Sequence, residues 1–142
     1  MKIRLLMLGK TRRPEMRAVL DDYVKRIGHQ SPIEVTEVRD GAAAMKQLEA
    51  DRAATVVLLD AAGKSFASEA FAKWLGEQRD RGTREICFLC GAADGFPNEL
   101  RQRARQKLSL GAMTFSHELA RVMLAEQLYR AFAILSGSPY PK

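Results

Sequence analysis

The run Thr55-Val56-Val57-Leu58-Leu59-Asp60 decides the fold class of this chain. Its apolar and β-branched residues are continuous and do not alternate with polar ones, which is typical of a strand covered on both faces. Strands of this kind belong mostly to parallel sheets that carry helices on both sides. The run therefore predicts a central strand of an α/β domain.

Further strands and helices alternate on either side of this run. Lys2–Leu8 and Glu85–Cys90 are expected to be buried strands, whereas Ile33–Val38 alternates apolar with polar residues, as a half-exposed edge strand does. The next apolar spacing predicts a helix that Pro14 opens and that Gly28 closes in the left-handed conformation. Other helices are expected over residues 42–50, from a Ser68 cap to Gly82, from Pro97 onward and over residues 118–135, with a short extended piece over residues 108–114. The alternation predicts one doubly wound parallel sheet.

Length and composition point to a single globular domain, residues 1–142. The chain has 142 residues, of which 46% are hydrophobic and 28% are charged, so it is neither a disordered nor a collagen-like chain. Its longest apolar runs are far shorter than the roughly 18 residues that a membrane-spanning helix needs, and its start lacks the apolar stretch of a signal peptide. We expect a cytosolic (cytoplasmic) location and no membrane partner.

The cysteines do not suggest a metal site. Cys87 and Cys90 lie three residues apart in a predicted strand, so their side chains should point to opposite faces of the sheet. A zinc site needs four ligands, and the only other soft candidates are His29 and His117. We expect two buried structural thiols and no metal.

Basic residues are concentrated at both ends of the chain. The formal net charge of +6 divides into +5 for residues 1–26, −3 for residues 27–96 and +4 for residues 97–142. This distribution suggests a polyanionic partner, most often nucleic acid, although many small basic proteins bind none.

Arginine outnumbers lysine by 15 to 8, which favours bidentate contacts with phosphate. Arg101, Arg103, Arg105 and Lys107 form one basic cluster, and a helix would place Arg101 and Arg105 on one face. Such a run is usually a solvated face. If the partner is RNA, the expected phosphate contacts are Arg12, Arg13, Arg101, Arg103 and Arg105.

Ligands of open α/β sheets bind at the carboxyl ends of the strands, so the loops there are the candidate sites. Residues 60–65 end in Gly-Lys-Ser, but Leu58 occupies the position of the earlier glycine that a triphosphate-binding loop needs, and we expect a strand-to-helix turn. Residues 91–97 are either a ligand loop or a tight turn with a left-handed glycine. Residues 108–117 either line a pocket with main-chain groups or form an edge strand followed by a Ser116 cap.

The long helix carries two adjacent apolar stripes, Leu124, Leu128, Ala131, Leu135 and Val122, Ala125, Tyr129, Phe132. This is wider than one sheet needs to cover. A second packing partner would explain the width, so we expect a homodimer through this helix. The alternative is a helix that lies deeper in its own core.

Several motifs of this sequence occur together in one known family. Leu59-Asp60 with Gly63-Lys64 comes first, then Gly91-Ala92-Ala93-Asp94-Gly95, then Leu108-Ser109-Leu110 through Met113-Thr114 to His117. Most specific is Glu126-Gln127-Leu128-Tyr129-Arg130-Ala131, and Ser138-Pro139-Tyr140 follows near the end. On these residues essentially the whole chain resembles the RlmH family of SPOUT methyltransferases.

The resemblance implies a parallel sheet whose C-terminal segment is threaded into a deep trefoil knot, and a homodimer. It implies S-adenosylmethionine as the cofactor and no metal. The implied reaction is methylation of ring nitrogen 3 of a pseudouridine in large-subunit ribosomal RNA, either free or within the ribosome. By motif position, the implied cofactor contacts are Leu59, Gly91, Gly111, Ala112, Met113, Thr114, Phe115 and Ser116.

The C-terminal tail, residues 138–142, departs from the family pattern. The family's His-Pro-Tyr-His-Arg reads Ser138-Pro139-Tyr140-Pro141-Lys142 here. The expected catalytic residues are Tyr140, which stacks on or hydrogen-bonds the base, Lys142, whose charge favours the imide anion, and Arg130, which holds a phosphate or the tail. Two alternatives remain, a catalytically silent RNA-binding relative that keeps the cofactor pocket and a small-molecule nucleotide-binding module.

Overall fold

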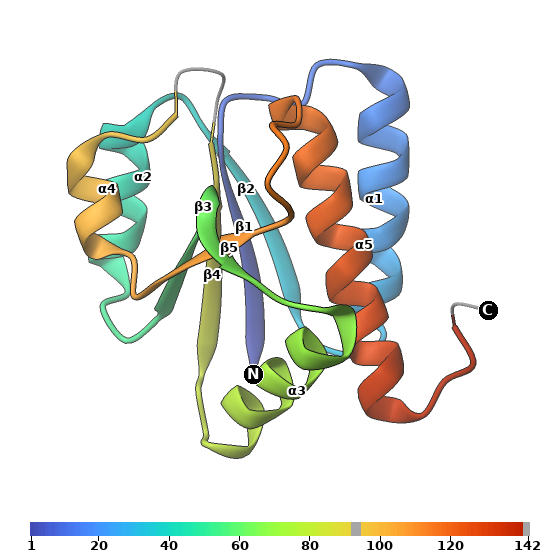
Figure 1. The fold of residues 1–142 in the computed structure, drawn as a ribbon. Coiled ribbons are helices and arrows are strands. Elements are labelled where there is room, and N and C mark those ends of the chain that lie inside the picture. Colours follow the sequence, from blue (N-terminus) through green and yellow to red (C-terminus); the bar gives the residue numbers. More distant parts are fainter. Residues whose placement is uncertain (92–94, 141–142) are drawn as a thin grey trace.

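Parallel strands form one sheet with helices on both faces (Figure 1). The computed structural model describes residues 1–91 and 95–140. Within these ranges the sheet has five strands in the order β2-β1-β4-β3-β5. The strands are β1 (Lys2–Leu8), β2 (Ile33–Val38), β3 (Thr55–Ser65), β4 (Glu85–Cys90) and β5 (Gln106–Ser109), and the helices are α1 (Pro14–Gly28), α2 (Gly41–Ala50), α3 (Ser68–Asp80), α4 (Asn98–Arg103) and α5 (His117–Ser136). The predicted α/β fold class is confirmed.

Each face of the sheet has its own apolar core. Successive side chains of a strand point to opposite faces, so Leu5 packs with α1, α3 and α5 whereas Leu6 packs with α2 and α4. Cys87 and Cys90 are buried in opposite cores, as their spacing predicted. Burial raises the pKa of both thiols to about 12, so they are inert structural groups.

The decisive run at residues 55–60 is an interior strand that lies one place from the middle, because β4 occupies the centre of the sheet. The turn expected after Asp60 is wrong. The chain bulges between Leu59 and Lys64 and then pairs with β5 again, so that both of these residues lie opposite Leu108. A Cβ atom on Gly63 would lie 2.6 Å from the backbone carbon of Lys107, and this close crossing explains the glycine.

Two expected helix ends are also corrected. Ser68 does not cap α3: the cap position is Ala67, and the Ser68 hydroxyl lies 2.8 Å from Oε1 of Gln127 on α5. Gly28 is the last residue of α1 and is not left-handed, because the chain continues through His29 at φ −76° and closes a tight turn. Pro14 and Ser116 open α1 and α5 as predicted.

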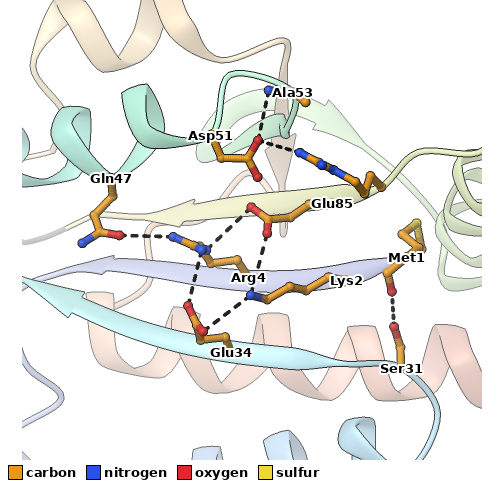
Figure 2. Close-up of polar contacts among 10 residues, drawn as sticks. Met1, Lys2, Arg4, Ser31, Glu34, Gln47, Asp51, Ala53 and Glu85 are labelled. Carbon is orange, nitrogen blue, oxygen red and sulfur yellow. Dashed lines mark hydrogen bonds and ion pairs between the residues drawn. The ribbon is translucent and has the colours of Figure 1, made fainter.

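The amino ends of the strands carry a network of paired charges (Figure 2). The Arg4 guanidinium lies 3.4 Å from Glu34 on β2 and 3.6 Å from Glu85 on β4, and it donates to Gln47 on α2 at 3.2 Å. Glu85 is almost fully buried, so it needs these partners. The network joins three strands and a helix, which is a structural role.

Helix α5 runs nearly the whole height of the molecule (Figure 1). Its 20 residues make it about 30 Å long. Helices α1 and α3 flank it and, together with the sheet, bury five residues of the apolar stripes from which a dimer was predicted, whereas Val122, Tyr129 and Leu135 are only partly buried. Most of the width of those stripes is therefore explained within one protomer. Of the helices that the structure describes, none has the length and apolar character needed to cross a membrane.

Candidate functional site

A small cavity lies at the carboxyl ends of β3 and β5. It measures about 170 Å³ and is lined by Leu59, Asp60, Ala61, Leu110, Gly111, Met113, Thr114, Phe115 and Ala120. This lining includes Leu59, Gly111, Met113, Thr114 and Phe115 from the predicted cofactor contacts, and the exposed Ala112 and Ser116 belong to the same loop. The bulge of β3 and the loop after β5 meet because the two strands are neighbours in the sheet.

The loop after β5 is shaped by a hydroxyl group and a glycine. Ser109 Oγ accepts the N–H of Gly111 at 3.1 Å and lies 3.0 Å from the carbonyl oxygen of Ala61, so it ties together the two loops that form the cavity. Gly111 has φ +149°, a conformation that residues with side chains rarely adopt. The result is a cleft with apolar walls and main-chain polar groups at its edge, which suits a flat aromatic ligand.

A second cavity of about 190 Å³ lies between α3 and α5 and shares Leu110 with the first. The hydrogen bond between Ser68 and Gln127 joins two of its lining residues. It is the weaker candidate, because none of the predicted cofactor contacts lines it.

The loop after β4 is only partly described. Ala92, Ala93 and Asp94 lie outside the described residues, so the choice between ligand loop and tight turn stays open for them. Gly95 has φ +80°, as a turn glycine would. A Cβ atom on Gly91 would meet the Phe96 ring at 3.1 Å, so bulk there would press on that ring first.

The structure does not bring the predicted RNA-contacting arginines together. Arg101 pairs with Asp60 at 2.7 Å, and a hydrogen bond from the Ala62 N–H, followed by this guanidinium, lowers the pKa of the Asp60 carboxyl. We expected Arg101 and Arg105 on one helix face, but α4 ends at Arg103 and Arg105 lies outside the helix. Arg105 instead lies just before β5, where its N–H donates to the carbonyl of Val56.

The other predicted pair, Arg12 and Arg13, lies in the loop between β1 and α1. Their main-chain N–H groups donate to the two carboxylate oxygens of Glu118, both at 3.0 Å, and both side chains are exposed. These hydrogen bonds lower the pKa of Glu118. The loop therefore lies against the first turn of α5, next to the cavity that Ala120 lines.

Two of the three predicted catalytic residues meet beside the second half of α5. Arg130 donates to Glu126 at 2.6 Å, the Tyr140 hydroxyl donates to the same carboxylate at 2.8 Å, and the Arg130 guanidinium lies 5.6 Å from the centre of the Tyr140 ring. Tyr140 also packs on Tyr129, with ring centroids 4.6 Å apart. Burial, helped by hydrogen bonds with Tyr23 and Glu126, raises the pKa of Tyr140, so it is a proton donor at neutral pH. Lys142, the third residue, lies outside the described residues.

Glu126 and Arg130 lie six and ten residues after Ala120, which lines the cavity, so the rise of an α-helix places them about 9 and 15 Å further along α5. Figure 1 shows the loop after β5 entering α5 at the carboxyl edge and the chain leaving α5 at the opposite edge. Neither Arg130 nor Tyr140 lines the cavity of its own protomer.

The whole chain resembles known methyltransferases. Residues 1–141 match a family model described as a predicted SPOUT methyltransferase. Proteins named ribosomal RNA large subunit methyltransferase H are 42% identical in Pelobacter propionicus, over 99% of both chains, and 41% identical in Geotalea daltonii, over 99% of both chains. The chain belongs to the RlmH family of SPOUT methyltransferases. For this family the trefoil knot is expected, and here it stays a prediction.

Solved structures agree on the SPOUT fold. The methyltransferase AviRb from Streptomyces viridochromogenes, in complex with its cofactor AdoMet, superposes with a TM-score of 0.54 at 12% identity, over 97% of this chain and 61% of its own. A probable methylase family protein from Haemophilus influenzae gives a TM-score of 0.61 at 13% identity, over 99% of this chain and 70% of its own. At these identities the likeness shows the fold alone.

Sequence reasoning missed several residues that organise this RlmH-family site. Ser109 ends a strand and gave no signal beyond its small size. Glu118 reads as an ordinary first-turn acid, and Arg121 as one more charge on a basic chain, yet Arg121 is fully buried. Glu126 lay inside the most specific family motif without an assigned role. Only the three-dimensional contacts of these side chains identify what they do.

Proposed function

We propose that this chain is an S-adenosylmethionine-dependent methyltransferase of large-subunit ribosomal RNA, and that its target is ring nitrogen 3 of a pseudouridine. The observation that carries the proposal is the cavity at the carboxyl edge, which gathers Leu59 and the 111–115 loop in a chain of the RlmH family. The target atom rests on the family resemblance. The relatives' printed names, ribosomal RNA large subunit methyltransferase H, support the RNA class.

The cavity fits this cofactor in its chemistry. Apolar side chains from Leu59, Leu110 and Phe115 would enclose the adenine, and main-chain groups around the Ser109-bound turn would meet the polar atoms of the nucleoside. Gly91, Ala112 and Ser116 stay predicted contacts at its rim. When bound, the cofactor supplies a methyl group that its sulfonium already activates, so the protein's task is to position the acceptor nitrogen.

The acceptor nitrogen is an imide N–H, which must lose its proton before it attacks. Positive charge lowers the pKa of such a group, and this is the role that we propose for Lys142. Tyr140 is protonated and therefore acts as a hydrogen-bond donor or stacking surface, not as a base. Arg130 holds the tail, because it contacts both Glu126 and the Tyr140 ring.

We assign these roles to two protomers, because Tyr140 and Arg130 do not line the cavity of their own chain. An apolar groove between α1 and α5, lined by Val19, Tyr23, Val122 and Met123, offers a face for a second copy. In a two-fold dimer with antiparallel α5 helices, the tail end of one α5 lies beside the cavity end of the other. We propose such a homodimer, with each site built from the cavity of one protomer and the tail of its partner.

The test is mass spectrometry of large-subunit ribosomal RNA from cells with and without this gene. The expected result is a pseudouridine that carries one methyl group in the parent and none in the deletion, with recovery on re-expression. Purified protein should transfer the methyl group to ribosomes or RNA from the deletion strain. An unchanged nucleoside profile would overturn the proposal.

The second candidate is an RNA-binding relative that keeps the cavity but has lost turnover. The observation in its favour is the tail, in which Ser138 and Pro141 stand where the family has histidines. This candidate predicts binding of S-adenosylhomocysteine and RNA together with no methyl transfer to ribosomes from the deletion strain. The same assay therefore separates the two candidates.

A further inference from the structure

The main chain of the loop between β1 and α1 is fixed by elements far away in the sequence. The Gly9 N–H donates to Val38 of β2, and the Thr11 N–H donates to the Glu37 carboxylate at 2.8 Å. The next two N–H groups, those of Arg12 and Arg13, are taken by Glu118 of α5. Four N–H groups of this loop thus have acceptors on β2 and α5, which fixes the backbone of the loop.

A buried arginine of α5 also holds this loop by hydrogen bonds. Arg121 is fully buried, and its guanidinium donates to the Thr11 hydroxyl at 2.9 Å and to the Leu8 carbonyl at 2.7 Å. Arg17 adds hydrogen bonds to the Thr11 carbonyl at 3.0 and 3.2 Å. A buried charge is tolerated only where its partners are fixed, so Arg121 ties the end of β1 and the loop to the first turn of α5.

The side chains on this fixed backbone face solvent and are basic. Lys10, Arg12 and Arg39 line a groove of about 410 Å³, together with Gly9, Glu37 and Val38, and we call it the basic groove. The Glu37 carboxylate already pairs with Arg17 at 2.8 Å. Burial raises the pKa of this carboxyl, but the hydrogen bonds from Thr11 and Arg17 together outweigh burial and lower it. The Arg39 side chain is 92% exposed, and its ion pair with Asp40 at 3.6 Å is of the weak surface kind. The Lys10, Arg12 and Arg39 side chains of the basic groove are therefore available to a ligand.

We infer that the basic groove binds the phosphate backbone of RNA, and that Glu118 and Arg121 are positioning residues that hold it in a binding shape. The inference rests on the proposed function for its RNA partner. Arginine and lysine side chains that project from a rigid concave backbone suit phosphate oxygens, and a ligand then loses less conformational entropy from the protein side. The groove and the candidate cofactor cavity both involve the first turn of α5, because Glu118 holds the groove and Ala120 lines the cavity.

Removing the Glu118 carboxylate tests the inference, because charge alone and positioning predict opposite changes in RNA affinity. Glu118 is an acid beneath a basic surface, so charge alone predicts that its removal strengthens binding of a polyanion. Positioning predicts the opposite, because the N–H groups of Arg12 and Arg13 lose their acceptor and the loop loosens. Glu15 provides the matched control: it carries the same charge in the first turn of α1, pairs with Arg13 only at 3.6 Å and is 71% exposed.

The experiment measures fluorescence anisotropy of a labelled 20-nucleotide oligouridylate with the full-length protein at several salt concentrations. We expect Glu118→Ala to weaken binding at least fivefold and Glu118→Gln, which keeps one acceptor oxygen, to weaken it less. Lys10→Ala and Arg39→Ala should each weaken binding and lower the log-log salt slope by about 0.7, the value for one phosphate on a single strand. Glu15→Ala should bind slightly more tightly than the wild type.

Equal or tighter binding by Glu118→Ala would overturn the positioning role, and unchanged salt slopes for Lys10→Ala and Arg39→Ala would overturn the groove. Should Glu118→Ala fail to fold, Glu118→Gln and the two groove variants decide the question. Failure of the proposed function is distinguishable, because methylation of ribosomes is read separately by mass spectrometry. If ribosomes are methylated but every variant binds RNA as the wild type does, only the groove proposal is contradicted. If the variants bind RNA more weakly but no methyl transfer is found, only the proposed enzymatic function is contradicted.

Discussion

The two ends of helix α5 differ in what surrounds them. At its first turn, Glu118 and Arg121 hold the loop after β1, and Ala120 lines the cavity. From its middle onward, Glu126 and Arg130 hold the tail through Tyr140. Both ends use charged side chains to fix a segment from elsewhere in the chain, but only the first lies at the carboxyl edge where parallel sheets bind ligands.

The difference suggests a division of labour along one helix. The first turn lies at the candidate cofactor cavity, whereas the second half of the helix holds a tail that does not line this cavity. The rise of the helix places Arg130 about 15 Å beyond Ala120, so one element sets the distance between the two regions. A partner protomer is the simple way to bring a tail to a cavity, and the predictions below separate the two ends.

The largest expected effect is at the cavity end. Gly111→Val should abolish binding of S-adenosylhomocysteine in calorimetric titration, because valine cannot adopt φ +149° without strain and the loop against the cavity would change shape. Gly82→Val is the matched control: Gly82 has φ +85° in the turn after α3, so it suffers comparable backbone strain away from the cavity. Equal losses of cofactor binding in both variants would show that general destabilisation is responsible.

The next effect is at the tail end. Removal of residues 139–142 leaves the Ser138 N–H on its Ala133 acceptor, so α5 keeps its end. We expect turnover to fall on the order of 10²-fold with nearly unchanged affinity for S-adenosylhomocysteine, since the tail acts on the acceptor base. The measurements are single-turnover methyl transfer and calorimetry. A parallel fall in cofactor affinity would place the tail at the cofactor itself.

A smaller effect is expected from Glu126→Gln, which leaves Arg130 and Tyr140 without their shared carboxylate. Loss of one charge-assisted contact that orders the tail should reduce turnover about tenfold. Combining it with Tyr140→Phe should add little, because both changes break the same contact. Glu69→Gln, at an exposed acid in the first turn of α3, is the control. Additive effects of the two changes would mean that Glu126 and Tyr140 act separately.

The smallest effect concerns stability against acid. The N–H groups of Arg12 and Arg13 lower the pKa of Glu118 in the folded protein. A lowered folded pKa contributes stability above the ordinary carboxyl range near 4.3, and this contribution is lost as the pH falls through the folded value. In urea unfolding at pH 7 and pH 3, Glu118→Gln should therefore show a smaller loss of unfolding free energy than the wild type. An equal loss in both proteins would mean that Glu118 is not stabilised by this contact.

Much of the fold could be predicted from periodicity, because buried parallel strands are continuous apolar runs and the helices show their apolar faces. The run at residues 55–60 is a buried strand and Pro14 begins a helix, as the sequence predicted. The strand order could not be read from local pattern, and neither could the close crossing at Gly63, because both depend on which segments meet in space.

The candidate site could be predicted where it follows a topological rule and not where it depends on individual contacts. The rule that ligands bind at strand ends and the family motif together pointed to Leu59 and the 111–116 loop, of which Leu59, Gly111, Met113, Thr114 and Phe115 line one cavity. The pairing of Arg101 with Asp60 could not be predicted, because a run of arginines does not reveal which of them has a carboxylate partner. Glu118 and Arg121 gave no signal at all, because a buried charge looks like any surface charge until its partners are known.

The most direct test of a shared site is complementation between two inactive variants. One carries Gly111→Val and keeps its tail, and the other lacks residues 139–142 and keeps its cavity. Co-expressed and randomly paired, half of the dimers are mixed, and each mixed dimer has one intact site out of two. We predict that methyl transfer returns to about a quarter of the wild-type rate, as expected for a two-fold homodimer. A mixture as inactive as either variant alone would contradict the shared site.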